Sequence, residues 1–205
     1  MLKFLFDIVF SLIGLIVFSP VLLAIVFLIK REDDGPVFYR GVRVGRFGKP
    51  FRIFKFRTMV INAEKIGGPS TADDDPRITR IGKFLRKYKL DELPQLINVL
   101  KGEMSFVGPR PEVQHYVNMF TEKEKAILSV RPGITDWASL WNSDEGATLA
   151  GSPNPEKTYI EKIRPMKLKL QLKYVKERTF LTDFKIIFLT LKAIVTKREQ
   201  VVGDR

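Results

Sequence analysis

The chain has 205 residues, a formal charge of +12 at pH 7 and a pI of about 9.9. That length suits one domain with a real core, or one domain with an appendage, and the charge indicates an anionic partner: nucleic acid, an acidic membrane surface or a phosphorylated substrate. There is no cysteine and a single histidine, His115, which excludes disulfides and thiol catalysis and argues against a His-based triad or a multi-His zinc site. Ionic chemistry must therefore rest on carboxylates, arginine, lysine and hydroxyl groups.

An uncharged, strongly apolar run covers residues 8–29. As a helix it reaches ~30 Å, enough to cross the hydrocarbon core of a bilayer. It lacks the basic start and the small-residue cleavage site of a secretory signal, so we expect an anchor that stays on the protein. The basic remainder of the chain is then expected to be cytoplasmic.

Ser19-Pro20 interrupts this run. Proline removes one helical hydrogen bond and clashes with the carbonyl group four residues earlier. Two arrangements are compatible with such a break: a kinked transmembrane helix, in which neighbouring groups repair the lost bond, and a re-entrant helix that enters one leaflet and returns. From this segment alone we favour the kinked span.

Residues 37–44 and 51–59 alternate between apolar and polar or basic side chains, with a turn-forming stretch between them. The pattern predicts a β-hairpin with arginine and lysine on its exposed face. Neither G-x-G-x-x-G nor G-x-x-x-x-G-K-[ST] occurs in the chain, so a Rossmann or P-loop nucleotide site has no support.

The loop over residues 64–75 ends in Asp73-Asp74-Asp75, which contains a D-x-D pattern. In many glycosyltransferases this pattern binds a metal and a nucleotide diphosphate, but there it follows an apolar strand. Asp75-Pro76 also has the sequence of a helix N-cap followed by proline in the first turn. We favour the cap.

A basic helix is predicted over residues 78–88, because apolar side chains recur there at helical spacing. The other faces carry the cations Arg77, Arg80, Lys83, Arg86, Lys87 and Lys89. A solvated basic face is the ordinary explanation of such a pattern. Because these cations lead directly into Asp91-Glu92, we prefer shared binding of an anion.

Asp91 and Glu92 open a short apolar helix that we expect to end at Lys101-Gly102, a good C-cap. Asp91 is predicted at or near the N-cap, where the helix dipole favours a carboxylate. Spacing alone favours a plain capping role. The same N-terminus is also a natural place to hold a phosphate, so a catalytic role for the pair stays open.

Arg110 lies between Pro109 and Pro111. The two prolines restrict the backbone on both sides, so the guanidinium has little entropy left to lose when it binds a phosphate. An ordinary extended turn explains the same residues equally well.

The C-terminal half reads as mostly helical. Residues 121–124 form a capping box that opens a helix, and another helix is predicted from Asn154 to the vicinity of Arg164-Pro165. Trp137 and Trp141, four residues apart, are expected in the core rather than as a platform for sugar stacking.

Two segments near the C-terminus carry conflicting or unusual patterns. Residues 167–173 alternate as in a strand, but their composition favours a helix, and we expect a helix. Residues 183–197 are apolar around most of a helical circumference, with Lys185, Lys192 and Thr196 on one stripe, which suits burial or a membrane interface.

Several motifs together resemble one known family, the bacterial sugar transferases, and within it the small monotopic phosphoglycosyl transferases. The resemblance covers nearly the whole chain. Besides the Ser-Pro break, it rests on five motifs in this order: residues 54–59 (FKFRTM), 75–82 (DPRITRIG), 90–95 (LDELPQ), 104–111 (MSFVGPRP) and 131–135 (RPGIT). The short chain resembles the minimal form, which lacks the extra transmembrane helices of larger relatives.

The resemblance implies an α+β fold with a re-entrant membrane helix over residues 1–31, broken at Ser19 and Pro20. Residues 32–205 would form a small, mostly helical cytoplasmic domain with a short β-hairpin and interfacial helices. The expected location is the cytoplasmic face of the bacterial inner membrane. This implication reverses the preference for a kinked span.

The resemblance also implies an activity: transfer of a sugar 1-phosphate from a UDP-sugar to polyprenyl phosphate, with release of UMP and with Mg²⁺, as the first membrane step of glycoconjugate synthesis. Asp91 would be the nucleophile that forms a covalent phosphosugar intermediate, and Glu92 its partner in handling metal and phosphate. The family's other substrate- and phosphate-binding positions map onto Lys55, Thr58, Arg86, Arg110, Arg131 and Asp183. The implied partners are the UDP-sugar, polyprenyl phosphate and the bilayer, without nucleic acid, and a homodimer is compatible with them.

The sugar itself is not implied, because residues 136–142 differ from the Gly-containing stretch of some relatives. Two alternatives remain. A non-catalytic, membrane-anchored basic module would bind anionic lipid or nucleic acid. A conventional metal-dependent glycosyltransferase using Asp73 and Asp75 would release UDP rather than UMP.

Overall fold

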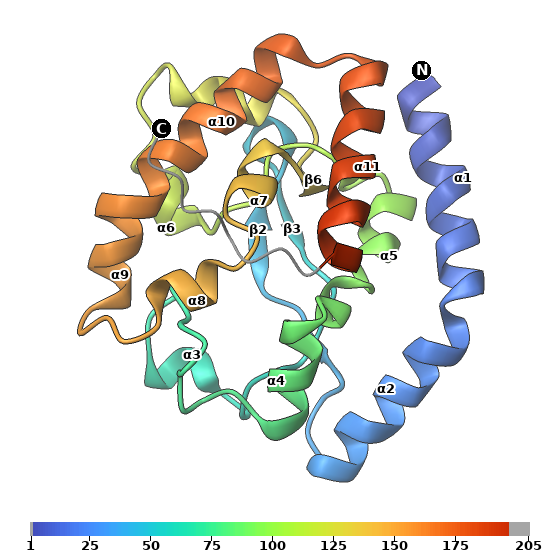
Figure 1. The fold of residues 1–205 in the computed structure, drawn as a ribbon, viewed down its shortest axis with the longest axis vertical. Coiled ribbons are helices and arrows are strands. Elements are labelled where there is room, and N and C mark those ends of the chain that lie inside the picture. Colours follow the sequence, from blue (N-terminus) through green and yellow to red (C-terminus); the bar gives the residue numbers. More distant parts are fainter. Residues whose placement is uncertain (1, 197–205) are drawn as a thin grey trace.

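The computed structural model describes residues 2–196, and Figure 1 shows their arrangement. Helices make up most of the molecule, and the strands are short, as the predicted α+β class requires. The N-terminal helices are α1 (Leu2–Val17), α2 (Ser19–Glu32), α3 (Ala63–Ile66), α4 (Arg80–Lys87), the 3₁₀ turn η2 (Leu90–Glu92), α5 (Gln95–Leu100) and α6 (Gln114–Val117). The C-terminal ones are η3 (Glu124–Ser129), α7 (Trp137–Trp141), α8 (Glu145–Leu149), α9 (Pro155–Thr158), η4 (Tyr159–Ile163), α10 (Arg164–Glu177) and α11 (Phe180–Thr196).

The predicted hairpin is confirmed, but it is divided into two short antiparallel pairs. Strand β2 (Val42–Val44) pairs with β3 (Pro50–Arg52), and β1 (Phe38–Tyr39) pairs with β4 (Lys55–Phe56). Asn98 on α5 joins this region to the helix, because its side chain accepts from Phe54 N at 2.8 Å and donates to Arg52 O at 2.9 Å. The hairpin thereby holds Lys55 beside the segment that carries Asp91.

A third sheet fixes the Pro-Arg-Pro segment. Strand β5 (Ser105–Val107) runs parallel to β6 (Gly133–Thr135), and Gly133 N donates to Pro109 O at 3.0 Å. The two backbones approach so closely that a Cβ atom on Gly133 would lie 2.1 Å from Gly108 N, so only glycine fits there. Arg110 therefore follows a rigid β5.

Helices α1 and α2 run along one side of the molecule (Figure 1) and are bent by 61° where one ends and the other begins. Pro20 lies in the first turn of α2, and Ser19 Oγ donates to Ile16 O at 2.7 Å. The break predicted at Ser19-Pro20 is confirmed. Among the described residues no single helix has the length and apolar character to cross a membrane, whereas this bent pair does by length and composition alone.

Both ends of the α1–α2 pair are attached to the rest of the protein. Near the start, Lys3 Nζ donates to Asp183 Oδ2 at 2.5 Å, and Asp7 Oδ1 accepts from Ser105 Oγ at 3.1 Å. Past the end of α2, Arg57 Nη1 donates to Asp33 Oδ2 at 2.8 Å. The pair therefore begins and ends on the same domain.

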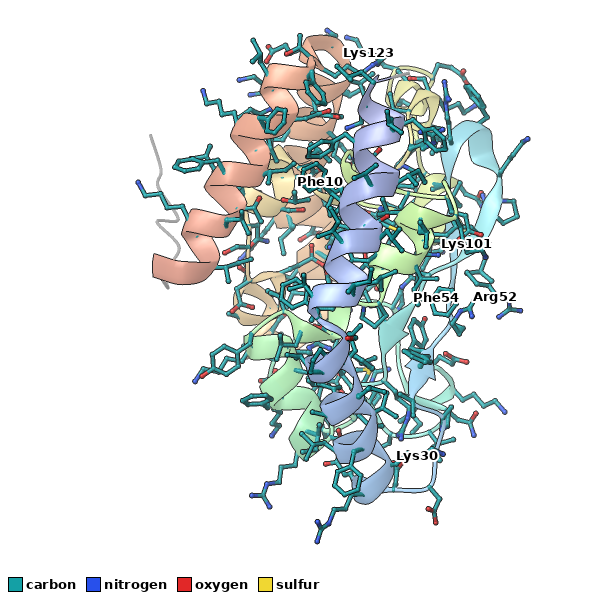
Figure 2. All side chains as sticks on the ribbon, turned by 90° about the vertical axis from the view of Figure 1, so that its right-hand side faces the viewer. Phe10, Lys30, Arg52, Phe54, Lys101 and Lys123 are labelled. Carbon is teal, nitrogen blue, oxygen red and sulfur yellow. The ribbon has the colours of Figure 1, made fainter. Side chains whose placement is uncertain are left out.

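Helix α11 lies beside α1, as Figures 1 and 2 both show. The rings of Phe6 and Phe184 are 5.3 Å apart, while Ile186 on another side of α11 is fully buried. Leu181, Phe188 and Leu191 are exposed. The helix predicted over residues 183–197 is thus present, with one buried face and one open apolar face, and Lys197 lies outside the described residues.

Two predicted helix boundaries are wrong. The helix that begins after Asn154 does not end at Arg164-Pro165: α9 passes through the π-helical turn η4 into α10, with Pro165 in the first turn of α10. The wider turn accommodates a proline that has no N–H to donate. The helix interpretation of residues 167–173 is confirmed by α10.

The second wrong boundary is the cap expected from Asp75-Pro76. Helix α4 begins later, and its N-cap is Thr79, whose side chain accepts from Gly82 N at 3.0 Å. Asp75 instead accepts from Arg77 Nη2 at 2.6 Å. The capping box at residues 121–124 is confirmed by reciprocal bonds between Thr121 and Glu124, although the helix it opens is 3₁₀.

Candidate active site

Three segments that are distant in the sequence bring four charged side chains together. Lys55 comes from β4, Asp91 and Glu92 from η2, and Arg110 from the loop after β5. The turn η2 follows α4 through Lys89, whose φ of 55° reverses the chain direction. The structure therefore assembles a carboxylate pair with two cations, as the anion-binding interpretation predicted.

Glu92 is saturated by cations. Lys55 Nζ donates to Glu92 Oε1 at 2.7 Å, and Arg110 Nη1 donates to Glu92 Oε2 at 3.1 Å. A second Arg110 nitrogen, Nη2, also binds Oε1. This two-nitrogen contact is the fork geometry in which arginine holds a carboxylate or a phosphate.

Asp91 has a different environment. Its residue is 7% exposed, yet within the described part of the chain its carboxylate accepts no hydrogen bond, and its one ion-pair contact is Lys55 Nζ at 3.9 Å from Oδ2. The expected role as helix N-cap is wrong, because the residue preceding α5 is Pro94 and no side chain caps that helix. The 3₁₀ turn places Asp91 before the helix rather than on its cap.

The two carboxyl groups titrate in opposite directions. Burial raises the pKa of Asp91 above its usual range; Lys55 opposes this effect and the negative Glu92 adds to it. Burial also acts on Glu92, but Arg110 and Lys55 outweigh it and hold the pKa of Glu92 well below its usual range. Neighbouring carboxyls with diverging pKa values are typical of sites in which two such groups have separate chemical roles.

Arg86 and Thr58 support the pair from α4 and from the end of the hairpin. The charge of Arg86 lowers the pKa of Asp91 and of Asp75, which indicates a cation facing both. Thr58 O accepts from Thr79 N at 3.0 Å, and a Cβ atom on Gly82 would lie 2.0 Å from that oxygen. Thr58 thus fixes the start of the helix that carries Arg86.

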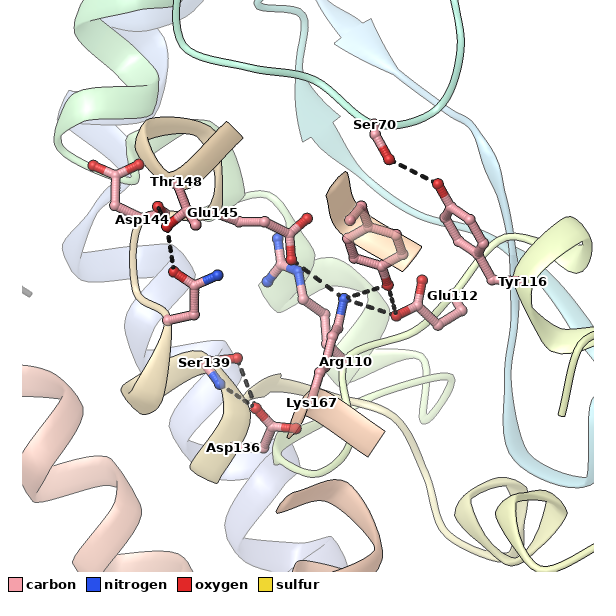
Figure 3. A network of polar contacts seen from close by, with 12 residues as sticks. Ser70, Arg110, Glu112, Tyr116, Asp136, Ser139, Asp144, Glu145, Thr148 and Lys167 are labelled. Atoms are coloured by element: carbon pink, nitrogen blue, oxygen red, sulfur yellow. Dashed lines mark hydrogen bonds and ion pairs between the residues drawn. The ribbon is translucent and has the colours of Figure 1, made fainter. Parts of the chain in front are cut away.

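Behind Arg110 lies a buried polar network that sequence reasoning missed (Figure 3). Lys167 Nζ contacts Glu112 Oε1 at 2.7 Å and Glu145 Oε2 at 3.5 Å, and donates to Tyr159 OH at 3.1 Å. Tyr159 OH in turn donates to Glu112 Oε1 at 3.1 Å. Glu112 lies two residues after Arg110, so the network anchors the segment that presents the guanidinium.

A family model for the bacterial sugar transferases matches residues 1–197. The chain belongs to this family. The resemblance on which the sequence analysis relied is therefore confirmed across nearly the whole chain.

Named relatives have related activities. The chain is 38% identical over 193 residues to a UDP-N-acetylgalactosamine-undecaprenyl-phosphate N-acetylgalactosaminephosphotransferase of Aeromonas hydrophila, covering 93% of this chain and 43% of that protein. It is 39% identical to the UDP-glucose:undecaprenyl-phosphate glucose-1-phosphate transferase of Escherichia coli, covering 93% and 40%. An uncharacterized sugar transferase of Bacillus subtilis, EpsL, is 37% identical, with 95% and 87% covered. The chain thus spans about two fifths of the first two relatives and most of the third.

Two positions that the family resemblance maps to the site have their partners elsewhere. Asp183 accepts from Lys3 and from Tyr174 OH, the latter at 2.7 Å. The Arg131 guanidinium lies 4.5 Å from the centre of the Phe4 ring. Both therefore tie the start of α1 to the sugar transferase domain, while Lys55 and Arg110 surround the carboxylate pair.

The D-x-D segment is engaged in contacts within the loop region. Asp75 is bound by the Arg77 guanidinium, and Asp74 Oδ2 accepts from Gly151 N at 3.0 Å. Burial, followed by the neighbouring Asp144, raises the pKa of Asp73. These aspartates connect the loop over residues 67–75 to the α8 region.

A magnesium ion, which the family resemblance implies, commonly takes one or two protein carboxylates together with substrate phosphates and water. Among residues 2–196 no group of three or more His, Cys, Asp and Glu side chains is placed to hold a metal ion by itself. Asp91 offers a carboxylate free of hydrogen bonds, whereas both oxygens of Glu92 bind cations. The residues therefore fit an ion held by Asp91 with substrate phosphate and water, and Glu92 would join by releasing a cation.

Proposed function

We propose that this protein transfers a sugar 1-phosphate from a UDP-sugar to polyprenyl phosphate and releases UMP, through a covalent intermediate on Asp91. The observation that carries the proposal is the contrast within the pair. Asp91 is buried and free of hydrogen bonds, while Glu92 beside it is bound by Lys55 and Arg110. Nucleophilic attack needs an available carboxylate in a cationic setting, and the names of the relatives supply the substrate class.

The reaction divides into two displacements at one phosphorus atom. An Asp91 oxygen attacks the phosphorus that carries the sugar, the bond from this phosphorus to the bridging oxygen breaks, and that oxygen leaves with UMP. A phosphate oxygen of the lipid then attacks the same phosphorus, and the bond to Asp91 breaks. The carboxylate is regenerated, and the product is a polyprenyl diphosphate sugar. An acyl phosphate is reactive enough to make the second step easier than direct transfer.

The protein must overcome repulsion between a carboxylate and a diphosphate. Lys55, Arg86 and Arg110 supply fixed positive charge around Asp91, and such preorganised charge stabilises the transferring phosphoryl group. A bound Mg²⁺ would act as a Lewis acid and neutralise charge on the diphosphate. The Arg110 guanidinium can exchange Glu92 for a phosphate because both present paired oxygens.

We infer that α1 and α2 form a re-entrant membrane element. Both ends of the pair bind the same domain through Lys3–Asp183 and Asp33–Arg57, while Leu5, Ile16 and Leu23 on the outer face are exposed. A large exposed apolar surface marks membrane contact. This element would hold the site at the depth of lipid headgroups, on the cytoplasmic face of the bacterial inner membrane, where a polyprenyl phosphate presents its phosphate.

The topology predicts one-sided labelling. Because the chain has no cysteine, single cysteines at Leu2 and Asp34 are unique labels, and both should react with a membrane-impermeant maleimide only after the cytoplasmic side is opened. Cysteines in the exposed domain surface, for example at Lys123, serve as the matched control. Labelling of the Leu2 position alone from the outside of intact cells would instead indicate a membrane-crossing helix.

The acid limb of the pH–rate profile should respond to Lys55. The Lys55 charge lowers the pKa of Asp91, so Lys55→Gln should raise that pKa further. Since the attacking carboxylate must be deprotonated, activity should be lost at a higher pH in the variant. We would measure UMP release from pH 4 to 8 alongside Lys101→Gln, which changes a half-exposed lysine paired with Glu103. An unmoved acid limb would contradict Asp91 as the ionising nucleophile.

Identifying the released nucleotide tests the function directly. Purified protein with polyprenyl phosphate, Mg²⁺ and a panel of UDP-sugars should yield UMP. A labelled donor without lipid acceptor should leave sugar phosphate on the protein. Release of UDP would indicate a conventional glycosyltransferase, and absence of any nucleotide release across the panel would favour a non-catalytic basic module.

A further inference from the structure

A groove between α7, α10 and α11 lies outside the catalytic cluster. It encloses about 500 Å³ and is lined by Trp137, Trp141, Met166, Leu170, Lys173, Glu177, Thr182 and Lys185. The α10 members at positions 166, 170, 173 and 177 follow helical spacing along one face. Lys167 and Tyr174 lie on a different face of the same helix, toward the network behind Arg110. The groove is therefore a separate feature.

The groove combines aromatic and cationic groups. Trp141 is 40% exposed, although its spacing from Trp137 had suggested a core position for both. Lys185 Nζ lies 5.9 Å from the Trp137 ring centre. In the part of the chain that the structure describes, neither Lys173 nor Lys185 forms an ion pair, and the Trp137 indole N–H has no hydrogen-bond partner. Two free ammonium groups against one lining carboxylate, Glu177, favour an anion.

The open apolar face of α11 adjoins this groove. Lys185 is four residues after Leu181 and three before Phe188, so the lysine and these exposed apolar side chains share neighbouring strips of one helix. Tryptophan and lysine next to exposed apolar residues are the composition of a membrane–water interface. A ligand there needs an anionic head for the groove and an apolar tail for α11.

We propose that the groove binds the headgroup of an anionic phospholipid of the surrounding bilayer, with its acyl chains along the exposed face of α11. This inference rests on the proposed function only in that both place the protein on a membrane. The phosphate would lie between Lys173 and Lys185, and the Trp137 N–H and Thr182 hydroxyl are available as donors. A soluble phosphate compound would satisfy the lysines but would leave Leu181 and Phe188 in water, so a lipid accounts for more of the surface.

Intrinsic fluorescence gives a selective readout, because the two tryptophans of the chain both line the groove. We would reconstitute the full chain into two kinds of vesicle with equal charge and equal bromine content. In one, phosphatidylglycerol carries dibrominated acyl chains; in the other, phosphatidylcholine carries them. A specific site predicts stronger quenching when phosphatidylglycerol is brominated, whereas equal quenching would overturn the proposal and indicate only general proximity to the bilayer.

The variant pair separates the groove from surface charge in general. Each lysine near an anionic surface contributes about a fivefold preference, so Lys173→Gln with Lys185→Gln should remove the difference between the two vesicles. Lys169→Gln with Lys176→Gln removes the same charge from exposed positions outside the groove and should preserve the difference. Loss of the difference in both double variants would contradict a specific site.

Two further arms identify the source of a signal. Inorganic phosphate added at high concentration should not reduce the lipid-specific quenching, and full competition would assign the site to soluble phosphates instead. UMP release measured on the same vesicles keeps the two proposals apart. A quenching difference without UMP release would contradict only the proposed function, and UMP release with equal quenching would contradict only the lipid site.

Discussion

Asp91→Asn is expected to reduce UMP release from a UDP-sugar by about 10³-fold or more, because an amide cannot act as the nucleophile that the covalent route needs. The variant should also fail to retain labelled sugar phosphate when no lipid acceptor is present. Both measurements use purified protein in the same vesicles. Asp34→Asn, at an exposed aspartate next to the end of α2, is the matched control and should keep full activity.

The same substitution should not damage the fold. The pKa of Asp91 is raised in the folded protein, so the folded state binds this proton more tightly than the unfolded chain does. The buried charge is then a cost to stability that is fully present above the folded pKa and disappears below the unfolded pKa. Removing the charge should raise Tm at neutral pH by about 2–4 °C, the shift that about 1 kcal/mol produces in a domain of this size.

These two readouts together make the result specific. Loss of activity with a raised Tm fits a residue held in an unfavourable environment for chemistry. Loss of activity with a clear drop in Tm would instead indicate a structural role for Asp91. Retention of near-normal UMP release would show that the nucleophile is another group.

Lys167→Met should cost the protein about 3–5 kcal/mol of folding free energy, because it leaves Glu112 buried without its cation. Lys167 is 7% exposed and is paired with Glu112 at 2.7 Å. Chemical denaturation of the protein in a fixed detergent measures the change. Lys169→Met alters an exposed lysine of the same helix and should change stability by no more than about 0.5 kcal/mol.

A double variant and pH test the physical cause. Glu112→Gln combined with Lys167→Met removes the unpaired charge and should recover part of the lost stability. In the wild type, Lys167 helps to hold the pKa of Glu112 below its usual range. In Lys167→Met the unpaired, buried Glu112 should titrate at a higher pH, so its stability deficit should shrink as the pH falls through that value. A deficit that does not change with pH would point to lost packing rather than to lost charge.

The Lys167 variant also links stability to the site. Glu112 follows Arg110 by two residues, and Pro111 between them transmits any displacement. We therefore expect the soluble fraction of Lys167→Met to bind the UDP-sugar more weakly as well. The network in Figure 3 is thus a support for the guanidinium rather than a second reactive centre.

Several features followed from the sequence because they depend on neighbours in the chain. The break at Ser19-Pro20, the capping box at Thr121 and the glycine C-cap after α5 are set by local backbone chemistry. The local reasoning was wrong where a longer-range contact won. Asp75 was expected to cap a helix, but the Arg77 guanidinium binds it and Thr79 performs the capping.

The candidate site was only partly predictable. The motif around Asp91 and Glu92 indicated an anion site, and the family resemblance added Lys55 and Arg110. Which carboxylate the cations bind was not predictable from the sequence, because Lys55 and Glu92 are 37 positions apart and their pairing depends on the docking of the hairpin. Lys167 was missed because, within an alternating Lys and Leu segment, a buried lysine has the same sequence pattern as an exposed one.

The sequence by itself determined the family, the bent N-terminal element and the presence of a carboxylate pair in a cationic chain, since motifs, proline breaks and composition are properties of the chain alone. Only the tertiary structure decided that Glu92 is neutralised while Asp91 stays free of hydrogen bonds. It also decided that both ends of the α1–α2 pair bind one domain. Burial and the distances between charges arise when separate segments pack together, and these quantities determine which carboxylate is available to react.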